Sequence, residues 1–389
     1  MAISLCKRAS GVIMITTDEY REMVDNCLRS CQLLGSMPQD EGRAIVEKLK
    51  YPDNFIELYQ YRRCNEFSFN DFLKNQITLV HPKHFNDIFE VMPFFNLREF
   101  VKMYEKFDSK TAKKYFDIAK ERDFSPLEIQ EIGGKNAANT LAFDARYLRD
   151  HGYEEQYYEL FEKIQDNGLM QMAQPINQVC RSKQEQTRIA CFSEDYDSPM
   201  MWGHYADSNR GFCVKHRLPV SLNMRLCPEN GMEQCDNLCS CVEGNCIKDG
   251  CHWLLPVIYC SERPDLISNL AEEISQTLFQ RMGLTPELDK IDLLAPLKFS
   301  CYKSINWKYE REWRWIRTHC TEAIPEFAPI SVGEITGLYL GERISKEHEN
   351  ILRDYASYYK MSDGNNIPIY KMKSSFTTPE YRLLADRIA

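Results

Sequence analysis

The chain has 389 residues, of which 43% are hydrophobic and 27% are charged, so a sizeable buried core is expected and a largely disordered chain is excluded. Its formal net charge of −9 argues against broad binding of nucleic acid by phosphate neutralisation, although a local basic groove is still compatible with it. No apolar run approaches the ~20 residues that span a bilayer. The apolar patch at residues 11–15 is too short for a secretory signal, so we expect a cytoplasmic protein without a membrane partner.

Residues 1–55 are expected to form a helical lead-in to a single α+β domain at residues 56–389. Thr16 and Glu19 have the spacing of a capping box, and apolar residues follow them at helical intervals. A second short helix is predicted at residues 41–50. These helices are a candidate surface for a protein partner.

Two short strands, a polar loop and a helical insertion follow in chain order. The strands are predicted at residues 59–61 and 77–80, with a helical turn at residues 70–74 between them. The loop occupies residues 81–90. Helical periodicity dominates residues 97–180, which we expect to be an insertion.

The second half of the chain mixes strands and helices without the regular alternation of a parallel α/β fold. We therefore predict an α+β class. The expected strands are at residues 187–192, 211–215, 309–317, 337–341 and 367–372, the expected helices are at 265–280, 289–302 and 345–359, and residues 219–255 are expected to be a cysteine-rich, irregular insertion.

The segment Trp307-x-Tyr309-Glu310-x-Glu312-Trp313-Arg314 carries the most chemical information. In a strand, Glu310, Glu312 and Arg314 would project from one face, because alternate residues share a face. Two carboxylates held together raise each other's pKa, as is common in active sites. The alternative is a solvated strand face on which the glutamates pair with basic neighbours such as Lys303, and such surface pairs contribute little to stability.

An earlier block combines Tyr59-x-Tyr61 with Phe85-Asn86-Asp87-x-Phe89-Glu90. Asn86 and Asp87 form turns, and their side chains can bond nearby backbone or a ligand ribose. His81 and His84 are three residues apart, but no third ligand with metal-site spacing lies nearby, so loop structure is favoured over a metal site there.

A middle block combines Cys191-Phe192-Ser193, Met201-Trp202-Gly203-His204-Tyr205-Ala206-Asp207 and Gly211-Phe212-Cys213. Trp202 is expected in the core, since it would pack from a buried helix. For His204 and Tyr205, core packing and ligand contact are equally compatible with the pattern, because polar-tipped residues rarely cluster for packing alone.

Six cysteines between Cys227 and Cys251 exceed any hydrophobic need. Thiolate clusters bind zinc tetrahedrally, but the spacing lacks paired C-x₂-C units, so a structural zinc and an unligated reduced loop both stay open. Disulfides would suit a secreted chain, and we expect this chain to be cytoplasmic, so disulfides are not favoured. The candidate zinc ligands are Cys235, Cys239, Cys241, Cys246 and Cys251.

The three blocks that contain Tyr59, Trp202 and Glu312, taken in this order, resemble the bacterial family called domain of unknown function 2971. They span roughly residues 55–372, with the helical and cysteine-rich regions as additions. The name of that family supplies no chemistry.

The Glu310-x-Glu312 pair is also similar to the third motif of ADP-ribosyltransferases. That resemblance implies a mainly antiparallel split β-sheet and nicotinamide adenine dinucleotide (NAD) as substrate. It places Glu312 at the catalytic position, where a carboxylate stabilises the positive charge left on ribose when nicotinamide departs. Glu310 would orient or deprotonate the acceptor. The histidine or aromatic role would fall among His84, His204 and Tyr205, Ser193 is similar in place to the middle-strand serine, and Tyr59, Tyr61, Asn86, Asp87, Trp202 and Arg314 are the further candidates for binding the dinucleotide.

Three functions follow as hypotheses. The first is an NAD-consuming transferase or glycohydrolase whose acceptor is protein, nucleic acid or water, as in bacterial toxins or phage defence. The second is a non-enzymatic protein that binds a ligand or partner through the same blocks. The third is a nuclease that holds magnesium with Asp87, Glu90, Glu310 and Glu312.

Overall fold

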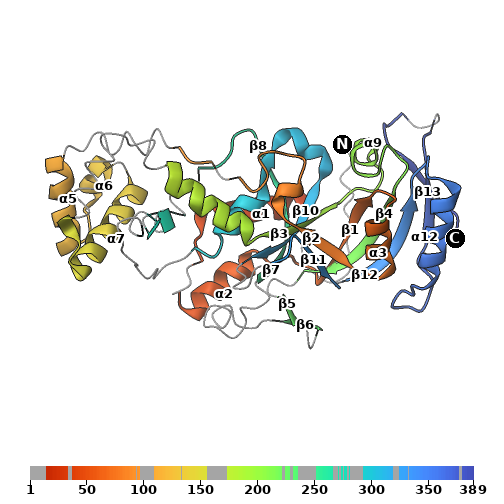
Figure 1. Ribbon diagram of the computed structural model, residues 1–389, viewed down its shortest axis with the longest axis horizontal. Coiled ribbons are helices and arrows are strands. Elements are labelled where there is room, and N and C mark those ends of the chain that lie inside the picture. The colour runs from red at the N-terminus through yellow and green to blue at the C-terminus, as the bar shows by residue number, and fades with distance from the viewer. Residues whose placement is uncertain are drawn as a thin grey trace.

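In the computed structural model (Figure 1), the chain folds around one large, mostly antiparallel sheet with helices packed on it, which confirms the predicted α+β class. The structure describes residues 15–33, 37–92, 94–96, 109–132, 134–155, 173–220, 224–227, 231–234, 251–265, 292–318, 324–331, 333–375 and 379–389, with a few single positions between 270 and 280.

Ten strands of the described chain make up the main sheet, and their pairings are antiparallel except that of β12 with β13. In sheet order, eight of them are β11 (Phe327–Ile330), β2 (Ile77–Val80), β3 (Arg188–Ser193), β1 (Phe55–Arg62), β4 (Phe212–Pro219), β12 (Glu334–Leu340), β13 (Ile369–Lys373) and β14 (Leu384–Arg387), while β10 (Glu312–Thr318) joins β3 to β7 (Cys251–Pro256). Two smaller ladders pair β5 (Met224–Cys227) with β6 (Gly231–Gln234) and β8 (Ile258–Cys260) with β9 (Tyr302–Ser304).

The sheet branches at β3. Ser193 pairs with β10 on one edge and with Tyr59 of β1 on the other. Ile189 likewise pairs with β10 on one edge and with Val80 of β2 on the other. Strands β1 and β2 therefore share one edge of β3 and lead to two different branches of the sheet.

Two of the predicted helix caps are present. Ser345 caps α12 as expected, and the capping box of Thr16 and Glu19 is present at the start of α1. No helix within the described residues is long and apolar enough to cross a membrane. The helices are α1 (Thr17–Ser30), α2 (Gln39–Lys48), α3 (Glu66–Leu73), η1 (Pro82–His84), α5 (Ser109–Glu121), α6 (Pro126–Ile132), α7 (Lys135–His151), α9 (Pro199–Tyr205), α11 (Ala295–Cys301), η4 (Ile305–Glu310) and α12 (Lys346–Ser357), and residues 173–185 are also helical.

Helix α1 is anchored on the sheet by both packing and charge. Tyr20, which is buried, stacks on Trp313 of β10 with ring centroids 5.7 Å apart. Beside β3, the Glu194 carboxylate accepts hydrogen bonds from Arg21 of α1 at 2.7 Å and from the Trp313 indole at 2.8 Å. The N-terminal helix is therefore part of the core that supports β3 and β10.

Helices α5, α6 and α7 bury their own apolar cluster, centred on Phe116 and Leu148. Figure 1 shows them together at one end of the molecule, away from the main sheet. With the helical residues 173–180, they make up most of the described part of the predicted helical insertion at residues 97–180.

Three predicted elements differ in the structure. The expected strand at residues 309–317 begins only at Glu312, because residues 305–310 form the 3₁₀ helix η4 and Arg311 adopts a left-handed conformation with φ 44°. The expected irregular insertion at 219–255 includes β7, whose Trp253, Leu254 and Leu255 are buried against β10. Of the helix expected at 289–302, whose described part begins at residue 292, only the seven residues of α11 are helical.

The turn from α9 to β4 depends on Gly211. A Cβ added there would overlap the carbonyl oxygen of Arg62 and lie 3.0 Å from Ala206 backbone atoms. A Cβ added at Gly203, in α9, would have no other atom within 4 Å.

We expect Gly211→Ala to lower the free energy of unfolding by about 2–3 kcal/mol or more and Gly203→Ala to leave it unchanged or raise it slightly. Urea denaturation of the two variants tests this, and equal effects would contradict it.

Candidate functional site

A cavity of about 140 Å³ lies where β1 and β10 meet β3, close to the branch point of the sheet. We call it the Glu310 cavity. Its walls combine aromatic side chains with a group of buried charges. They are formed by Tyr59, Gln60, Tyr61, Arg62, Phe85, Asn86, Glu90, Cys191, Phe192, Ser193, Met201, Tyr205, Lys303, Glu310 and Glu312.

Lys303 is the centre of the buried charges. Its ammonium nitrogen lies 2.7 Å from a carboxylate oxygen of Glu310, 3.0 Å from one of Glu312 and 3.0 Å from one of Glu90. All four side chains are at most 7% exposed. The solvated strand face that the sequence also allowed is therefore wrong, although the pairing with Lys303 is as expected.

Arg314, two residues after Glu312 in β10, completes this cluster. Its Nε donates to Glu312 at 2.8 Å, one Nη donates to Glu90 at 2.8 Å, and the other donates to the carbonyl of Ser300. The charged members are three carboxylates, those of Glu90, Glu310 and Glu312, and two cations, so the cluster carries a net charge of −1 when every carboxylate is ionised.

The two central glutamates differ in electrostatics. Burial and the neighbouring charge of Glu312 raise the pKa of Glu310 to about 7, although Lys303 and Tyr205 counteract part of that rise. Burial would raise the pKa of Glu312 as well, but the charges of Arg314 and Lys303 hold it well below its usual range. Glu312 is thus a permanent anion, and Glu310 gains or loses a proton near neutral pH.

The two glutamates also differ in the number of hydrogen bonds that their carboxylate oxygens accept. Glu312 accepts from Arg314 on one oxygen and from both Arg314 and Lys303 on the other. Glu310 accepts one hydrogen bond on each oxygen, from Lys303 and from the hydroxyl of Tyr205 at 2.5 Å. Because a carboxylate oxygen has two lone pairs, Glu310 keeps acceptor capacity toward the cavity.

Tyr205 connects Glu310 to the loop after β2. Burial and the Glu310 carboxylate raise the pKa of Tyr205, so its hydroxyl stays protonated and donates a hydrogen bond to Glu310. The side-chain amide of Asn86 donates to the same hydroxyl at 3.3 Å. This chain joins α9, η4 and the 85–90 loop around one carboxylate.

Ser193 has a structural position in the cavity wall. Its hydroxyl donates to the backbone carbonyl of Glu310 at 2.7 Å and accepts from the backbone of Asp195. Tyr59 and Tyr61 of β1 line the same wall, and the hydroxyl of Tyr61 is bonded to the Asp195 carbonyl. Ser193 therefore positions η4 at the end of β10.

Five predicted residues, Arg314 among them, do not line the Glu310 cavity. His84 pairs with Glu326 at the surface, and Trp202 is fully buried with its indole bonded to the Tyr196 carbonyl, as its expected core role requires. His204 is exposed, and its ring centroid is 6.3 Å from that of Tyr205. Asp87 lines a second cavity.

The predicted zinc ligands Cys235, Cys239, Cys241 and Cys246 lie outside the described residues. Cys251 is the first residue of β7 and pairs with Thr318. Within the described part of the chain, no group of three or more histidine, cysteine, aspartate or glutamate side chains could hold a metal ion. The position between Glu90, Glu310 and Glu312 is filled by the ammonium of Lys303.

Lys303 and Cys191 belong to the site, although the sequence offered Lys303 only as a partner of the glutamates and Cys191 only as part of the middle block. Lys303 precedes Glu310 by seven residues, and nothing in its local sequence marks it as buried. Cys191 bonds Glu312, and burial raises the pKa of its thiol well above the usual range, so it is neutral. A lysine just before a 3₁₀ turn and a carboxylate-rich strand was the available signal.

Comparison with protein families gives one finding. The model of the family described as "Protein of unknown function (DUF2971)" matches residues 201–315. That stretch runs from α9 to β10 and holds Tyr205, Lys303, Glu310 and Glu312, so the predicted resemblance is confirmed for these residues. Neither the curated proteins nor the solved structures gave a match.

The cluster predicts opposite effects of removing its two central carboxylates. Because the pKa of Glu310 is raised in the folded state, the folded chain binds more protons than the unfolded chain between about pH 4.5 and 7, and stability falls as pH rises through that window. We expect Glu310→Gln to raise the free energy of unfolding by about 1–3 kcal/mol at pH 8 and to change it little at pH 5.

The matched variant Glu312→Gln removes a permanent anion from two buried cations. We expect it to lower the free energy of unfolding by about 3–5 kcal/mol at both pH values. Denaturant titrations at pH 5 and pH 8 compare the two variants. A larger loss for Glu310→Gln than for Glu312→Gln at pH 8 would contradict the charge assignment.

Proposed function

We propose that the protein is an NAD-consuming enzyme of the ADP-ribosyltransferase or glycohydrolase type, with Glu310 as its acid–base and charge-stabilising carboxylate. The observation that carries the proposal is the placement of Glu310. It is buried at a cavity wall, has spare acceptor capacity, and has a pKa of about 7. The Glu310-x-Glu312 resemblance and the branched, mostly antiparallel sheet also support it.

The chemistry of NAD cleavage suits such a site. Nicotinamide leaves the ribose as a neutral molecule, so the departing group needs no proton, and positive charge develops on the ribose. A buried anionic group that is already in place stabilises that charge without the cost of reorganising solvent. The cluster around Lys303 supplies a net charge of −1 when Glu310 is ionised.

The geometry favours an exchange of the roles expected for the two glutamates. Glu312 is occupied by Arg314 and Lys303 on both oxygens, so it serves best to hold these cations. Glu310 can accept a ribose hydroxyl, and in a second step it can take the proton from an attacking acceptor such as water. Tyr205 keeps Glu310 oriented toward the cavity.

The remaining walls suit a flat ring beside a sugar. Tyr59 and Phe85 present aromatic surface, and the Asn86 amide lies at the rim near Tyr205. His204 is next in sequence to Tyr205 and exposed, so it is available to an acceptor and not to the buried ribose. The acceptor, whether protein, nucleic acid or water, and a role in toxicity or phage defence are parts of the proposal that rest on the resemblance alone.

One observation favours the second candidate, a non-enzymatic ligand-binding protein. Every carboxylate in the cluster has a cation partner, as in a purely structural network. The nuclease hypothesis has less support, because Lys303 occupies the space between three of its four proposed magnesium ligands and Asp87 lies in the wall of another cavity.

Nicotinamide release from NAD by the purified protein is the direct test. We expect release by the wild type, with a cell lysate supplied as a source of acceptors, and at least a 100-fold slower rate for Glu310→Gln. The control is Glu326→Gln, which removes a surface carboxylate that pairs with Lys83 and His84 outside the cavity. Absence of release from the wild type would reject the enzyme and favour the binding protein, whereas full activity of Glu310→Gln would reject Glu310 as the catalytic carboxylate.

The pKa of Glu310 predicts the pH dependence of this activity. Only the ionised carboxylate can stabilise the ribose cation, so the rate should rise with pH and level off above the pKa of about 7. A single ionisation at that pKa gives about a 30-fold increase between pH 5.5 and pH 8. Initial rates at saturating NAD across this range measure it. A flat profile, or a rate that falls with rising pH, would assign the chemistry to another group.

A further inference from the structure

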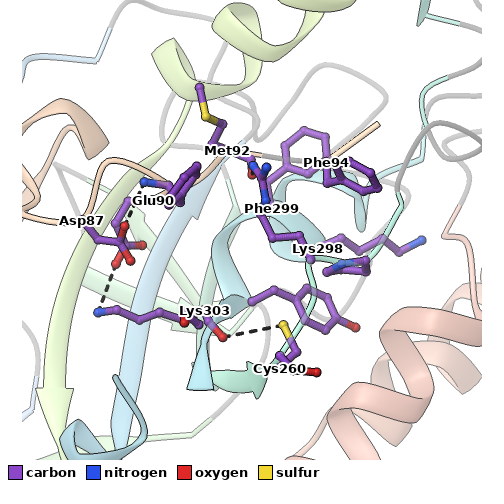
Figure 2. Close-up of a pocket in the computed structure, with 14 residues that line it drawn as sticks. Asp87, Glu90, Met92, Phe94, Cys260, Lys298, Phe299 and Lys303 are labelled. Atoms are coloured by element: carbon purple, nitrogen blue, oxygen red, sulfur yellow. Dashed lines mark hydrogen bonds and ion pairs between the residues drawn. The ribbon is translucent and has the colours of Figure 1, made fainter. Parts of the chain in front are cut away.

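A second cavity, of about 220 Å³, lies on the other side of the Glu90–Lys303 ion pair. We call it the Arg263 cavity. Glu90 and Lys303 line both cavities, so the same ion pair forms a shared wall. Figure 2 shows this pair along one side of the second cavity, with Phe94 and Phe299 on the far side.

Arg263 is the cation of this cavity that no described carboxylate neutralises. Lys298 is paired with Asp292 at 2.9 Å, and Lys303 is paired with three glutamates. Arg263 makes one long hydrogen bond, of 3.5 Å, to the carbonyl of Met92, and no ion pair within the described chain. Its guanidinium donors are therefore available to an anion.

Two phenyl rings hold this guanidinium in place. Its central carbon lies 4.8 Å from the ring centroid of Phe89 and 5.6 Å from that of Phe94, distances at which a cation interacts with an aromatic face. An arginine that is restrained by two rings loses less freedom when it binds a ligand, and its guanidinium presents its donors as a fork that matches a phosphate group.

The mouth of the cavity is apolar although it faces solvent. Phe89 is 51% exposed and Met92 is 48% exposed, beside the exposed Arg263. Exposed apolar side chains next to a cation that no described carboxylate neutralises are typical of a ligand site. A ligand that satisfies both features has a flat, weakly polar ring and an anionic group, as a nucleoside phosphate does.

We propose that the Arg263 cavity binds a nucleoside diphosphate, with Arg263 on the phosphates and the base against the apolar mouth formed by Phe89 and Met92. This inference rests on the proposed function, because it makes the cavity the place of the adenosine diphosphate half of NAD. The shared wall of Glu90 and Lys303 then lies alongside the middle of the dinucleotide, and the nicotinamide ribose reaches Glu310.

Calorimetric titration of the full-length protein with ADP tests the proposal without any turnover. We expect wild type to bind ADP and Arg263→Gln to bind it at least about tenfold more weakly. The matched control is Arg217→Gln. Arg217 also lies over a phenyl ring, that of Phe55 at 4.5 Å, but outside both cavities, so its substitution should leave ADP binding unchanged.

Two further probes separate the base from the phosphates and one cavity from the other. Pyrophosphate should bind more weakly than ADP, and nicotinamide mononucleotide should bind wild type and Arg263→Gln alike, since it lacks the adenosine half. No binding of ADP, equal binding to wild type and Arg263→Gln, or pyrophosphate binding as tight as that of ADP would each overturn the proposal. Arg263-dependent binding of ADP with no nicotinamide release from NAD would keep the nucleotide site and reject only the enzyme.

Discussion

The contact of one buried ammonium, that of Lys303, with three buried carboxylates is the interaction on which the rest of this site depends. Glu90, Glu310 and Glu312 would repel one another in a medium of low polarity if no cation were present. Lys303 and Arg314 together leave one negative charge uncompensated, and the structure places that excess on Glu310. The ionised form of this residue therefore lowers stability, and it is the form that the proposed reaction needs.

The topology of the sheet is what brings these groups together. β10 carries Glu312 and Arg314, and its edge-to-edge pairing with β3 places Ser193 under the backbone of Glu310. Glu90 comes from a loop more than 200 residues earlier in the chain and reaches Arg314 because β1 and β2 leave the same edge of β3. The branch in the sheet thus makes room for a polar centre inside an otherwise apolar core.

The two cavities share two residues of the same charged cluster, Glu90 and Lys303. The Glu310 cavity has a carboxylate that can change its charge near neutral pH, next to aromatic walls. The Arg263 cavity has a cation without a carboxylate partner among the described residues, next to an exposed apolar mouth. The Glu90–Lys303 pair lies between the two cavities, and the proposed ligand has two correspondingly unlike halves, a cationic ring with its ribose and an anionic nucleotide.

The sequence by itself determined the local elements, because their signals are local. Capping at Thr16 and Ser345 and the β-branched run at residues 77–80 correctly predicted helix starts and a strand, and linked blocks correctly predicted the family resemblance over residues 201–315. Only the tertiary structure decided the state of the charges. Whether Glu310 is solvated or buried depends on Lys303, Tyr205 and Glu90, which come from separate elements, and on the left-handed Arg311 that ends η4. A pKa is set by burial and by neighbours in space, neither of which the spacing of residues along a strand can report.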